Sequence, residues 1–379
     1  MKTTRRHTFK LLGLALAMAG AGSLALPAHA AGDWDDDGFR SGKVFTSTNA
    51  VGANEVLVYD TDTDGKLSLL TRLATQGQGT GTGLGNQGAV TLSGNGRYLF
   101  VVNALSNTVS TFSVRRKGLQ LESTVDTGGL RPISVTEHDG IVVVLNAGGA
   151  GNVAGFRNWE GHLKSLPDAV RPLSAASGTG AAQVGFSPDG DVLLVTEKGT
   201  NKLTTYRVRH DGRIGAPLVT ASSGATPFGF SFDKRGNVIV SEAVGGAAGA
   251  STVSSYGFES RAPAQPVLIS ASVPDTQSAV CWVVVTPNGR YAYVTNTGSG
   301  TVSSYSVQKS GKLTLAEAVA VTSGAGPIDA AISGTGKGLF VLNSGSRSIS
   351  SFSIGKDGSL GNASSVDGVP AGANGLAAN

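Results

Sequence analysis

Two glutamates occupy positions where the chain could perform acid–base or cation chemistry. Glu197 and Glu242 each end an apolar run, VLLVTE and NVIVSE. The five comparable runs of the chain end instead in Asn49, Asn103, Asn146, Asn296 and Asn343. Neighbouring carboxylates can act as a general base and its partner, or bind a cation. We therefore take Glu242 as the candidate base and Glu197 as its partner, with Arg131 or nearby amides as donors to a tetrahedral oxyanion. The alternative is two solvated carboxylates on loops.

Four further side chains occupy similar positions in successive repeats of the chain. Each lies seven or eight residues before the turn glycine of its repeat, and they are Gln183, Phe228, Trp282 and Asp329. Together with Asn103, Asn146, Asn296 and Asn343 they could form a polar binding surface with one aromatic wall, on which Trp282 would stack a sugar ring. The alternatives remain open. Trp282 could be a buried aromatic, and each asparagine could cap a tight turn, where its side chain bonds the backbone.

Histidine and cysteine chemistry has little support. His7 and His29 lie in the N-terminal leader, and His138, His162 and His210 fall in turns that the repeat described below places away from the two glutamates. No Ser-His-Asp triad or zinc cluster can be assembled from these positions. Cys281 is the only cysteine, so no intramolecular disulfide can form.

Two acidic stretches imitate calcium loops. Residues 33–38 and 60–65 both read D-x-D-x-D-G, but the twelfth position is Val44 or Thr71 instead of the bidentate Glu of an EF-hand. The second stretch also falls where a polar hairpin turn is expected. We predict no metal site and no cofactor, with calcium at residues 33–38 as the weaker alternative.

The elements that must position these residues recur along the chain. The turn glycines at 96, 140, 190, 236, 289 and 336 are 44, 50, 46, 53 and 47 residues apart. An apolar run follows each of them, then an alternating segment such as residues 108–114 (TVSTFSV), a polar turn and a fourth short strand. Four strands in a period of this length are typical of a β-propeller blade. The continuous apolar run favours a fully buried second strand, and the alternation favours a half-exposed third strand.

The seventh repeat is divided between the two ends of the chain. Residues 43–49, 55–60 and 66–73 supply three strands, and residues 372–379 resemble a first strand with nothing after it. Pairing the N- and C-terminal strands would close the ring and remove an exposed edge. We predict an all-β, seven-bladed propeller with four-stranded blades over residues 43–379. The ends of the second strands and the residues before the turn glycines would then lie at one mouth of the channel.

The N-terminus has the features of an export signal. Basic residues at 2, 5, 6 and 10 precede an apolar stretch at 11–26 and the small-x-small sequence Ala28-His29-Ala30. We predict a signal peptide at residues 1–30, of the twin-arginine or the general secretory kind, and a flexible acidic segment at residues 31–42. The mature protein would be exported to a periplasm or to the medium.

Charge excludes some classes of partner. Four of the 30 Lys and Arg residues lie in the leader, so 30 − 4 = 26 basic residues balance 26 acidic ones in the remainder. Nucleic-acid binding needs a basic surface and is not expected. The apolar stretch is short for a membrane span, and none is predicted in the mature chain. We expect a monomer whose ligand is a small molecule or a glycan.

The repeat resembles a known family. Residues 290–307 (RYAYVTNTGSGTVSSYSV) contain the tetrapeptide of the YVTN propeller repeats. The SPDG turn at 187–190, the VVN strand end and the TVSTFSV strand followed by G-x-L are more similar to lactonase-type propellers, which include 6-phosphogluconolactonase-like and carboxymuconate-cyclase-like proteins. The resemblance implies hydrolysis of a lactone at the channel mouth by Arg, His and Glu side chains. Of these, only Glu242 matches, because AAQ at 181–183 and PFG at 227–229 replace the expected His and Pro-Arg-His.

Three functions follow from these observations. The first is an exported hydrolase of a small sugar or organic-acid lactone that uses Glu242 and Glu197. The second is a non-catalytic propeller that binds a ligand, glycan or protein at its polar mouth. The third is a cell-surface repeat protein of the YVTN kind.

Overall fold

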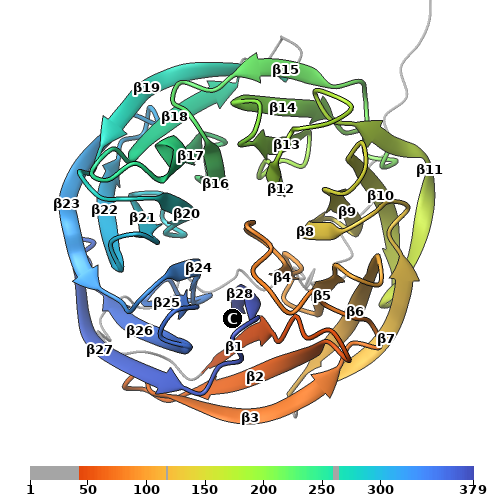
Figure 1. Cartoon of the computed structure of the whole chain (residues 1–379), viewed down its shortest axis with the longest axis horizontal. Coiled ribbons are helices and arrows are strands. Elements are labelled where there is room, and N and C mark those ends of the chain that lie inside the picture. Colours follow the sequence, from red (N-terminus) through yellow and green to blue (C-terminus); the bar gives the residue numbers. More distant parts are fainter. Residues whose placement is uncertain (1–41, 117, 259–263) are drawn as a thin grey trace, which may run out of the picture. The chain divides into compact units, whose positions relative to one another are not determined.

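Seven four-stranded antiparallel sheets are arranged around a central axis as the blades of a propeller (Figure 1). This computed structural model describes residues 42–116, 118–258 and 264–379. The prediction of an all-β, seven-bladed propeller is therefore confirmed. The predicted signal peptide, the acidic segment up to residue 41 and the first calcium-like stretch lie outside the described residues.

In six blades the strands run in sequence order from the axis to the rim. In the remaining blade the C-terminal strand is innermost and the first three strands of the chain follow it. The first three blades in chain order consist of β28 (Asn374–Ala378), β1 (Gly42–Ser47), β2 (Glu55–Thr61) and β3 (Leu67–Ala74); β4 (Val90–Leu92), β5 (Tyr98–Asn103), β6 (Thr108–Arg115) and β7 (Gly118–Asp126); and β8 (Pro132–His138), β9 (Ile141–Asn146), β10 (Asn152–Trp159) and β11 (His162–Pro172). The next two consist of β12 (Ala181–Phe186), β13 (Val192–Glu197), β14 (Lys202–Arg207) and β15 (Leu218–Ala221); and β16 (Pro227–Phe232), β17 (Val238–Glu242), β18 (Thr252–Phe258) and β19 (Pro266–Pro274). The last two consist of β20 (Val280–Val285), β21 (Tyr291–Asn296), β22 (Thr301–Val307) and β23 (Leu313–Thr322); and β24 (Pro327–Ile332), β25 (Gly338–Asn343), β26 (Ser348–Ile354) and β27 (Leu360–Asp367).

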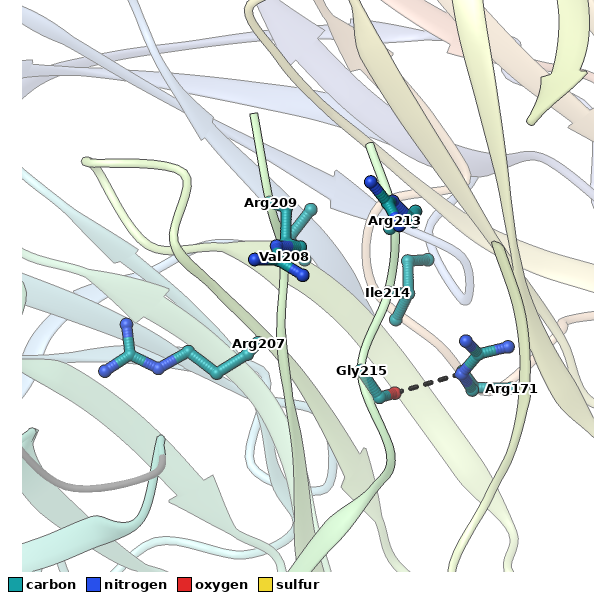
Figure 2. A pocket seen from close by; sticks show the side chains of 7 residues that line it. All are labelled: Arg171, Arg207, Val208, Arg209, Arg213, Ile214 and Gly215. Carbon is teal, nitrogen blue, oxygen red and sulfur yellow. Dashed lines mark hydrogen bonds between the residues drawn. The ribbon is translucent and has the colours of Figure 1, made fainter. Parts of the chain in front are cut away.

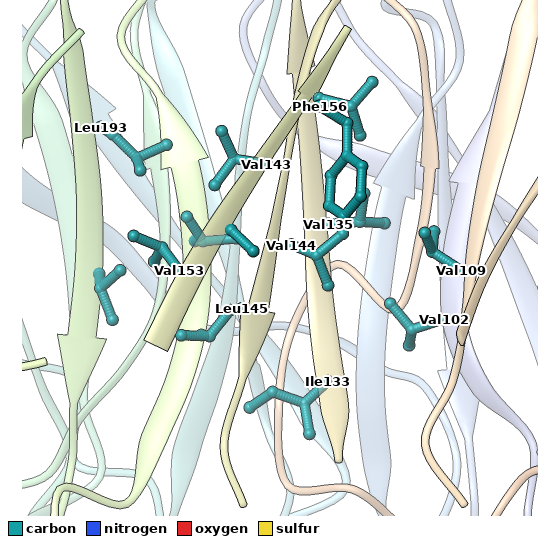
Figure 3. Close-up of a cluster of buried hydrophobic side chains, with 14 of the residues drawn as sticks. Val102, Val109, Ile133, Val135, Val143, Val144, Leu145, Val153, Phe156 and Leu193 are labelled. Atoms are coloured by element: carbon teal, nitrogen blue, oxygen red, sulfur yellow. The ribbon is translucent and has the colours of Figure 1, made fainter. Parts of the chain in front are cut away.

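The second strands are the most apolar because a neighbouring blade covers each of their faces. Every residue of β9 and β25 is buried. Side chains from three successive blades pack on the two faces of β9: in Figure 3, Val144 of β9 lies toward Val102 of β5, and Val143 of β9 lies toward Leu193 of β13. The core of the ring therefore lies between the blades.

The prediction that the third strands are half-exposed was wrong. β22 is buried over its first five residues, and Ser303 within it is fully buried. Its Ser and Thr residues lie on both faces of the strand, and their hydroxyls bond backbone carbonyls, as Ser303 does with Ala318 O at 2.7 Å. The alternation of exposed and covered residues belongs to outer strands such as β23.

Ring closure joins the two ends of the described chain. β28 pairs antiparallel with β1 from Val44↔Ala378 to Ser47↔Asn374, so the first blade receives its innermost strand from the C-terminus. This pairing confirms the division of the seventh repeat. It also gives the edge of β1 a hydrogen-bonded partner.

The connections between blades pass close above the second-strand ends of the next blade. A side chain at Gly77 would collide with the amide of Asn103, and one at Gly224 would collide with the carboxylate of Glu242. Glycine is therefore required where these connections cross. In the part of the chain that the structure describes, no helix has the length and apolar character needed to cross a membrane.

Candidate functional site

Aromatic side chains from two blades meet beside the central axis. Phe228 of β16 and Trp282 of β20 lie 5.2 Å apart between ring centroids, and both belong to a buried cluster with Cys281. The connection between β3 and β4 reaches into this space, where the Trp282 indole donates to Asn86 O at 2.6 Å. Two of the predicted ligand-binding residues are thus brought together.

Glutamine side chains tie the elements around the axis to one another. Gln87, in the same connection, donates to Val283 O at 2.9 Å and accepts from Val283 N at 3.3 Å. Gln183 of β12 forms the equivalent pair with the backbone of Phe230, at 3.0 and 2.6 Å. The amide of Gln183 is therefore engaged in joining two inner strands, and residues 84–88 occupy the axis.

Lys198 lies beside this aromatic pair. It directly follows β13, and its ammonium nitrogen is 4.7 Å from the centre of the Phe228 ring. The same Nζ donates to Gly85 O at 2.6 Å and to Ala181 O at 3.4 Å. An amine held between two carbonyls and an aromatic face has a fixed position, which a long exposed lysine lacks.

Burial lowers the pKa of Lys198 to about 8, and the positive charge of Arg131 acts in the same direction. Cys281 acts in the opposite direction and raises the pKa of Lys198. A lysine with this pKa is partly neutral near pH 8, and its free lone pair can then accept a proton. Lys198 is the described side chain at the axis best suited to general-base chemistry.

Two acidic groups of the same region have raised pKa values. Burial raises the pKa of the Cys281 thiol to about 11, so this cysteine is a thiol at neutral pH and a poor nucleophile. Burial also raises the pKa of Asp329 well above its usual range, against the opposing effect of the amides of Ala330, Leu376 and Gly88. Asp329 accepts from Ala330 N at 2.8 Å and is 2% exposed.

Glu242 is fully buried at the end of β17. Its carboxylate accepts from Gly224 N at 2.7 Å, Thr252 Oγ1 at 2.6 Å and Ser254 Oγ at 2.6 Å. A fourth bond comes from Ser272 Oγ at 2.9 Å. All four donors come from β18, β19 and the preceding connection, so the carboxylate points toward the rim of its own blade.

Glu197 has the same surroundings in the preceding blade. It is fully buried and accepts from Ser174 N at 3.0 Å, Thr204 Oγ1 at 2.7 Å and Thr200 Oγ1 at 2.9 Å. The Ser174 hydroxyl also donates to it. The two glutamates thus bond separate groups of hydroxyls and amides, and they are not brought together as a pair. A part for either in catalysis stays a prediction.

The predicted asparagines are also buried in their blades. Asn103, Asn146, Asn296 and Asn343 are fully buried. Asn296 donates to Thr301 Oγ1 at 3.1 Å and to Ser303 Oγ at 2.8 Å, and Asn103 and Asn343 form similar bonds with third-strand hydroxyls. They cross-link the second and third strands. A left-handed turn conformation is found instead at Asn49, with φ of 49°.

Arg131 is exposed on the connection that leads into β8. Its φ is 52°, and its amide donates to Asn107 Oδ1 at 2.7 Å. Because its charge reaches Lys198, it belongs to the same end of the channel. Of the three predicted catalytic residues, it is the one that remains open to solvent.

The sequence matches the family described as lactonase, 7-bladed beta-propeller, over residues 52–166, 150–245 and 248–378. This chain belongs to that family. None of the curated proteins matches the sequence.

Solved structures share the fold of this lactonase-family propeller at low sequence identity. A periplasmic gluconolactonase from Pseudomonas aeruginosa is 20% identical, with a TM-score of 0.70 over 89% of this chain and 98% of its own. A putative 6-phosphogluconolactonase from Bacteroides fragilis is 19% identical, with a TM-score of 0.69 over 90% and 98%. A protein from Lactobacillus plantarum is 17% identical, with a TM-score of 0.71 over 89% and 99%.

Lys198 is the residue of this lactonase-family propeller that sequence reasoning missed. Its position directly after a strand-end glutamate was the available signal. Its contacts come from Gly85, Ala181 and Phe228, which are distant from one another in the sequence.

The second calcium-like stretch forms the β2–β3 hairpin of the lactonase-family propeller. Asp62 accepts from the amides of Asp64 and Lys66 at 3.0 and 2.8 Å, and Asp60 forms an ion pair with Lys43 at 2.6 Å. Among the described residues, no group of three or more His, Cys, Asp or Glu side chains could hold a metal ion. The stretch serves as a turn.

Proposed function

We propose that this protein is an exported hydrolase that opens the ring of a small sugar or organic-acid lactone, with Lys198 as its general base. The lactonase family supplies the reaction class, and the predicted signal peptide supplies the compartment. The observation that carries the proposal is the position of Lys198, whose pKa of about 8 accompanies a fixed place beside Phe228.

The reaction would proceed through a tetrahedral intermediate. Neutral Lys198 would keep its two N–H groups on Gly85 O and Ala181 O, which leaves the lone pair to take a proton from water. The hydroxide would add to the lactone carbonyl, and the Arg131 guanidinium would stabilise the oxyanion. When the ring C–O bond breaks, the protonated Lys198 would return its proton to the leaving alkoxide and release a hydroxy acid.

Phe228 would form the apolar wall of the binding site, because one face of a sugar ring packs well on an aromatic surface. Trp282, which is buried, would support the Phe228 ring from behind. The buried glutamates would hold the mouth of the channel in shape. In this account Glu197 and Glu242 support the loops that carry Lys198 and the connection before β16.

The test is acid release at constant pH from a panel of aldono- and organic-acid lactones, with protein that begins at residue 31. We expect turnover well above the buffer rate for at least one lactone. Lys198→Met should lower that rate at least about 100-fold, the usual range for loss of a general base. The matched control is Lys312→Met, which removes an exposed lysine in the turn before β23. Equal rates in the two variants would exclude Lys198 as the base.

A second candidate is ligand binding without turnover. The specific observation in its favour is the occupation of the axis by residues 84–88, where Gln87 and Asn86 bond the inner strands. Under this alternative, the folded protein would bind a lactone or sugar in calorimetry while none of the panel is hydrolysed.

A further inference from the structure

A pocket rich in arginine lies at the junction of the third and fourth blades, away from the aromatic pair at the axis. It has a volume of about 540 Å³ and is lined by Arg171, Arg207, Val208, Arg209, Arg213, Ile214 and Gly215. We refer to it as the arginine pocket (Figure 2). Its volume lies within the range of pockets that bind small molecules.

The backbone of the arginine pocket is well held. Val208 and Ile214 form a β-bridge beyond β14, and both side chains are buried. The turn is closed by bonds from Arg209 N to Arg213 O at 3.0 Å and from Gly212 N to Arg209 O at 2.7 Å. Its guanidinium groups therefore project from a fixed frame with an apolar base.

The third blade contributes a further charge from its outer strand. Arg171 of β11 donates through Nε to Gly215 O at 3.2 Å (Figure 2). It also donates through Nη1 to Val170 O at 2.8 Å. Both partners are neutral carbonyls, so the bonds fix the guanidinium without neutralising it. The site thus depends on the packing of two blades.

Acidic residues neutralise this cluster only in part. Arg213 pairs with Asp211 at 2.7 Å, Arg207 lies 3.6 Å from Asp191, and Asp168 attracts Arg213 from farther away. Among the described residues, the guanidinium of Arg209 forms no hydrogen bond or ion pair, and Asp211 attracts it only from farther away.

Arg209 and Arg213 face each other across the turn, where like charges on opposed residues repel. Figure 2 shows them side by side, with Arg207 extending to the opposite side. A guanidinium forms two parallel hydrogen bonds with a carboxylate or a phosphate, and an anion held between several of them removes their repulsion. The missing component of this cluster is negative charge.

We propose that the arginine pocket binds a multivalent oxyanion that carries carboxylate or phosphate groups. Arg209 and Arg213 hold one acidic group between them, and Arg171 holds a second. The ligand is either a free small anion or the acidic units of a polysaccharide, which present the same chemistry. The site is separate from the proposed lactone chemistry and does not depend on it.

The test is calorimetric titration of the full mature chain at pH 7.5 and low ionic strength with citrate, inorganic pyrophosphate and polygalacturonate. We expect saturable binding of at least one probe that weakens as salt is added. Arg209→Gln should weaken it about tenfold or more, because a charge-assisted pair is lost. Arg209 is exposed, so this variant should fold and keep the wild-type melting temperature.

The matched control is Arg115→Gln, which removes an exposed, ion-paired arginine of the second blade and should leave binding unchanged. Binding of citrate or pyrophosphate that is lost in Arg209→Gln identifies a free small anion. Binding of polygalacturonate alone, lost in the same variant, identifies a polymer. Absence of binding by all three probes, or equal binding by Arg209→Gln and the wild type, would overturn the proposal.

Discussion

At the residue scale, the chemistry of this propeller depends on side chains that its fold withdraws from water. Lys198 has a lowered pKa because backbone of the β3–β4 connection and of β12, together with the Phe228 ring, surrounds its amine. The two glutamates are buried more completely, but each is satisfied by four donors. Burial thus yields a titratable base in one case and a structural cross-link in the other.

Lys198→Met should change the dependence of stability on pH. Because the pKa of Lys198 falls from 10.5 to about 8 on folding, the unfolded chain binds more protons between these values. The stability of the wild type should therefore rise relative to the variant as pH increases from about 8 to 10.5, by about 3 kcal/mol at most. Urea unfolding of both proteins at pH 7.5 and pH 10 measures this gain. An identical pH dependence in both would contradict the lowered pKa.

Glu242→Gln should destabilise the protein by about 2–4 kcal/mol, because it places an NH₂ group among donors that need an acceptor. Glu55→Gln, at a glutamate whose side chain is 37% exposed, is the matched control and should change stability little. Denaturant unfolding of the two variants gives the comparison. An unchanged stability of Glu242→Gln combined with lost hydrolysis would instead support Glu242 as the catalytic base.

At the element scale, strand order and burial follow from the repeat, whereas the connections could not be predicted from it. The apolar second strands and the turn glycines are local signals, and the structure confirms the blades they indicate. The third strands were misjudged because their Ser and Thr side chains are buried and bond carbonyls. Residues 84–88 carried no sequence signal, since their partners Ala182 and Val283 belong to other blades.

Gln87→Ala should lower the free energy of unfolding by about 1–2 kcal/mol, because it removes two hydrogen bonds to Val283 and leaves a buried backbone pair unsatisfied. Thermal or urea unfolding measures the loss. Gln308→Ala, in the exposed turn after β22, is the control. If both variants were equally stable, residues 84–88 would not brace the channel.

At the scale of the whole molecule, the two ends of the described chain hold the ring closed. The sequence predicted this closure because the first blade lacked an inner strand and the C-terminus offered one. The arginine pocket was not predicted, although Arg207, Arg209 and Arg213 lie close together in the sequence, because Arg171 joins them only when two blades pack. The sequence repeat thus predicts the blades and their closure into a ring, but it does not predict a pocket that forms between two blades.

Deletion of residues 374–379 should destabilise the ring, because it removes β28 and leaves the edge of β1 unpaired. We expect a lower melting temperature, measured by circular dichroism, and association of the truncated chains, measured by size-exclusion chromatography. A monomeric truncated protein with the wild-type melting temperature would show that closure contributes little.

The pH dependence of kcat/KM for the best lactone substrate tests the central claim most directly. After subtraction of the buffer rate, the wild type should show a limb that rises with pH through an apparent pKa of about 8, because only neutral Lys198 accepts the proton of water. A profile without this limb, or one that Lys198→Met reproduces at the same rate, would contradict the assignment of Lys198 as the base.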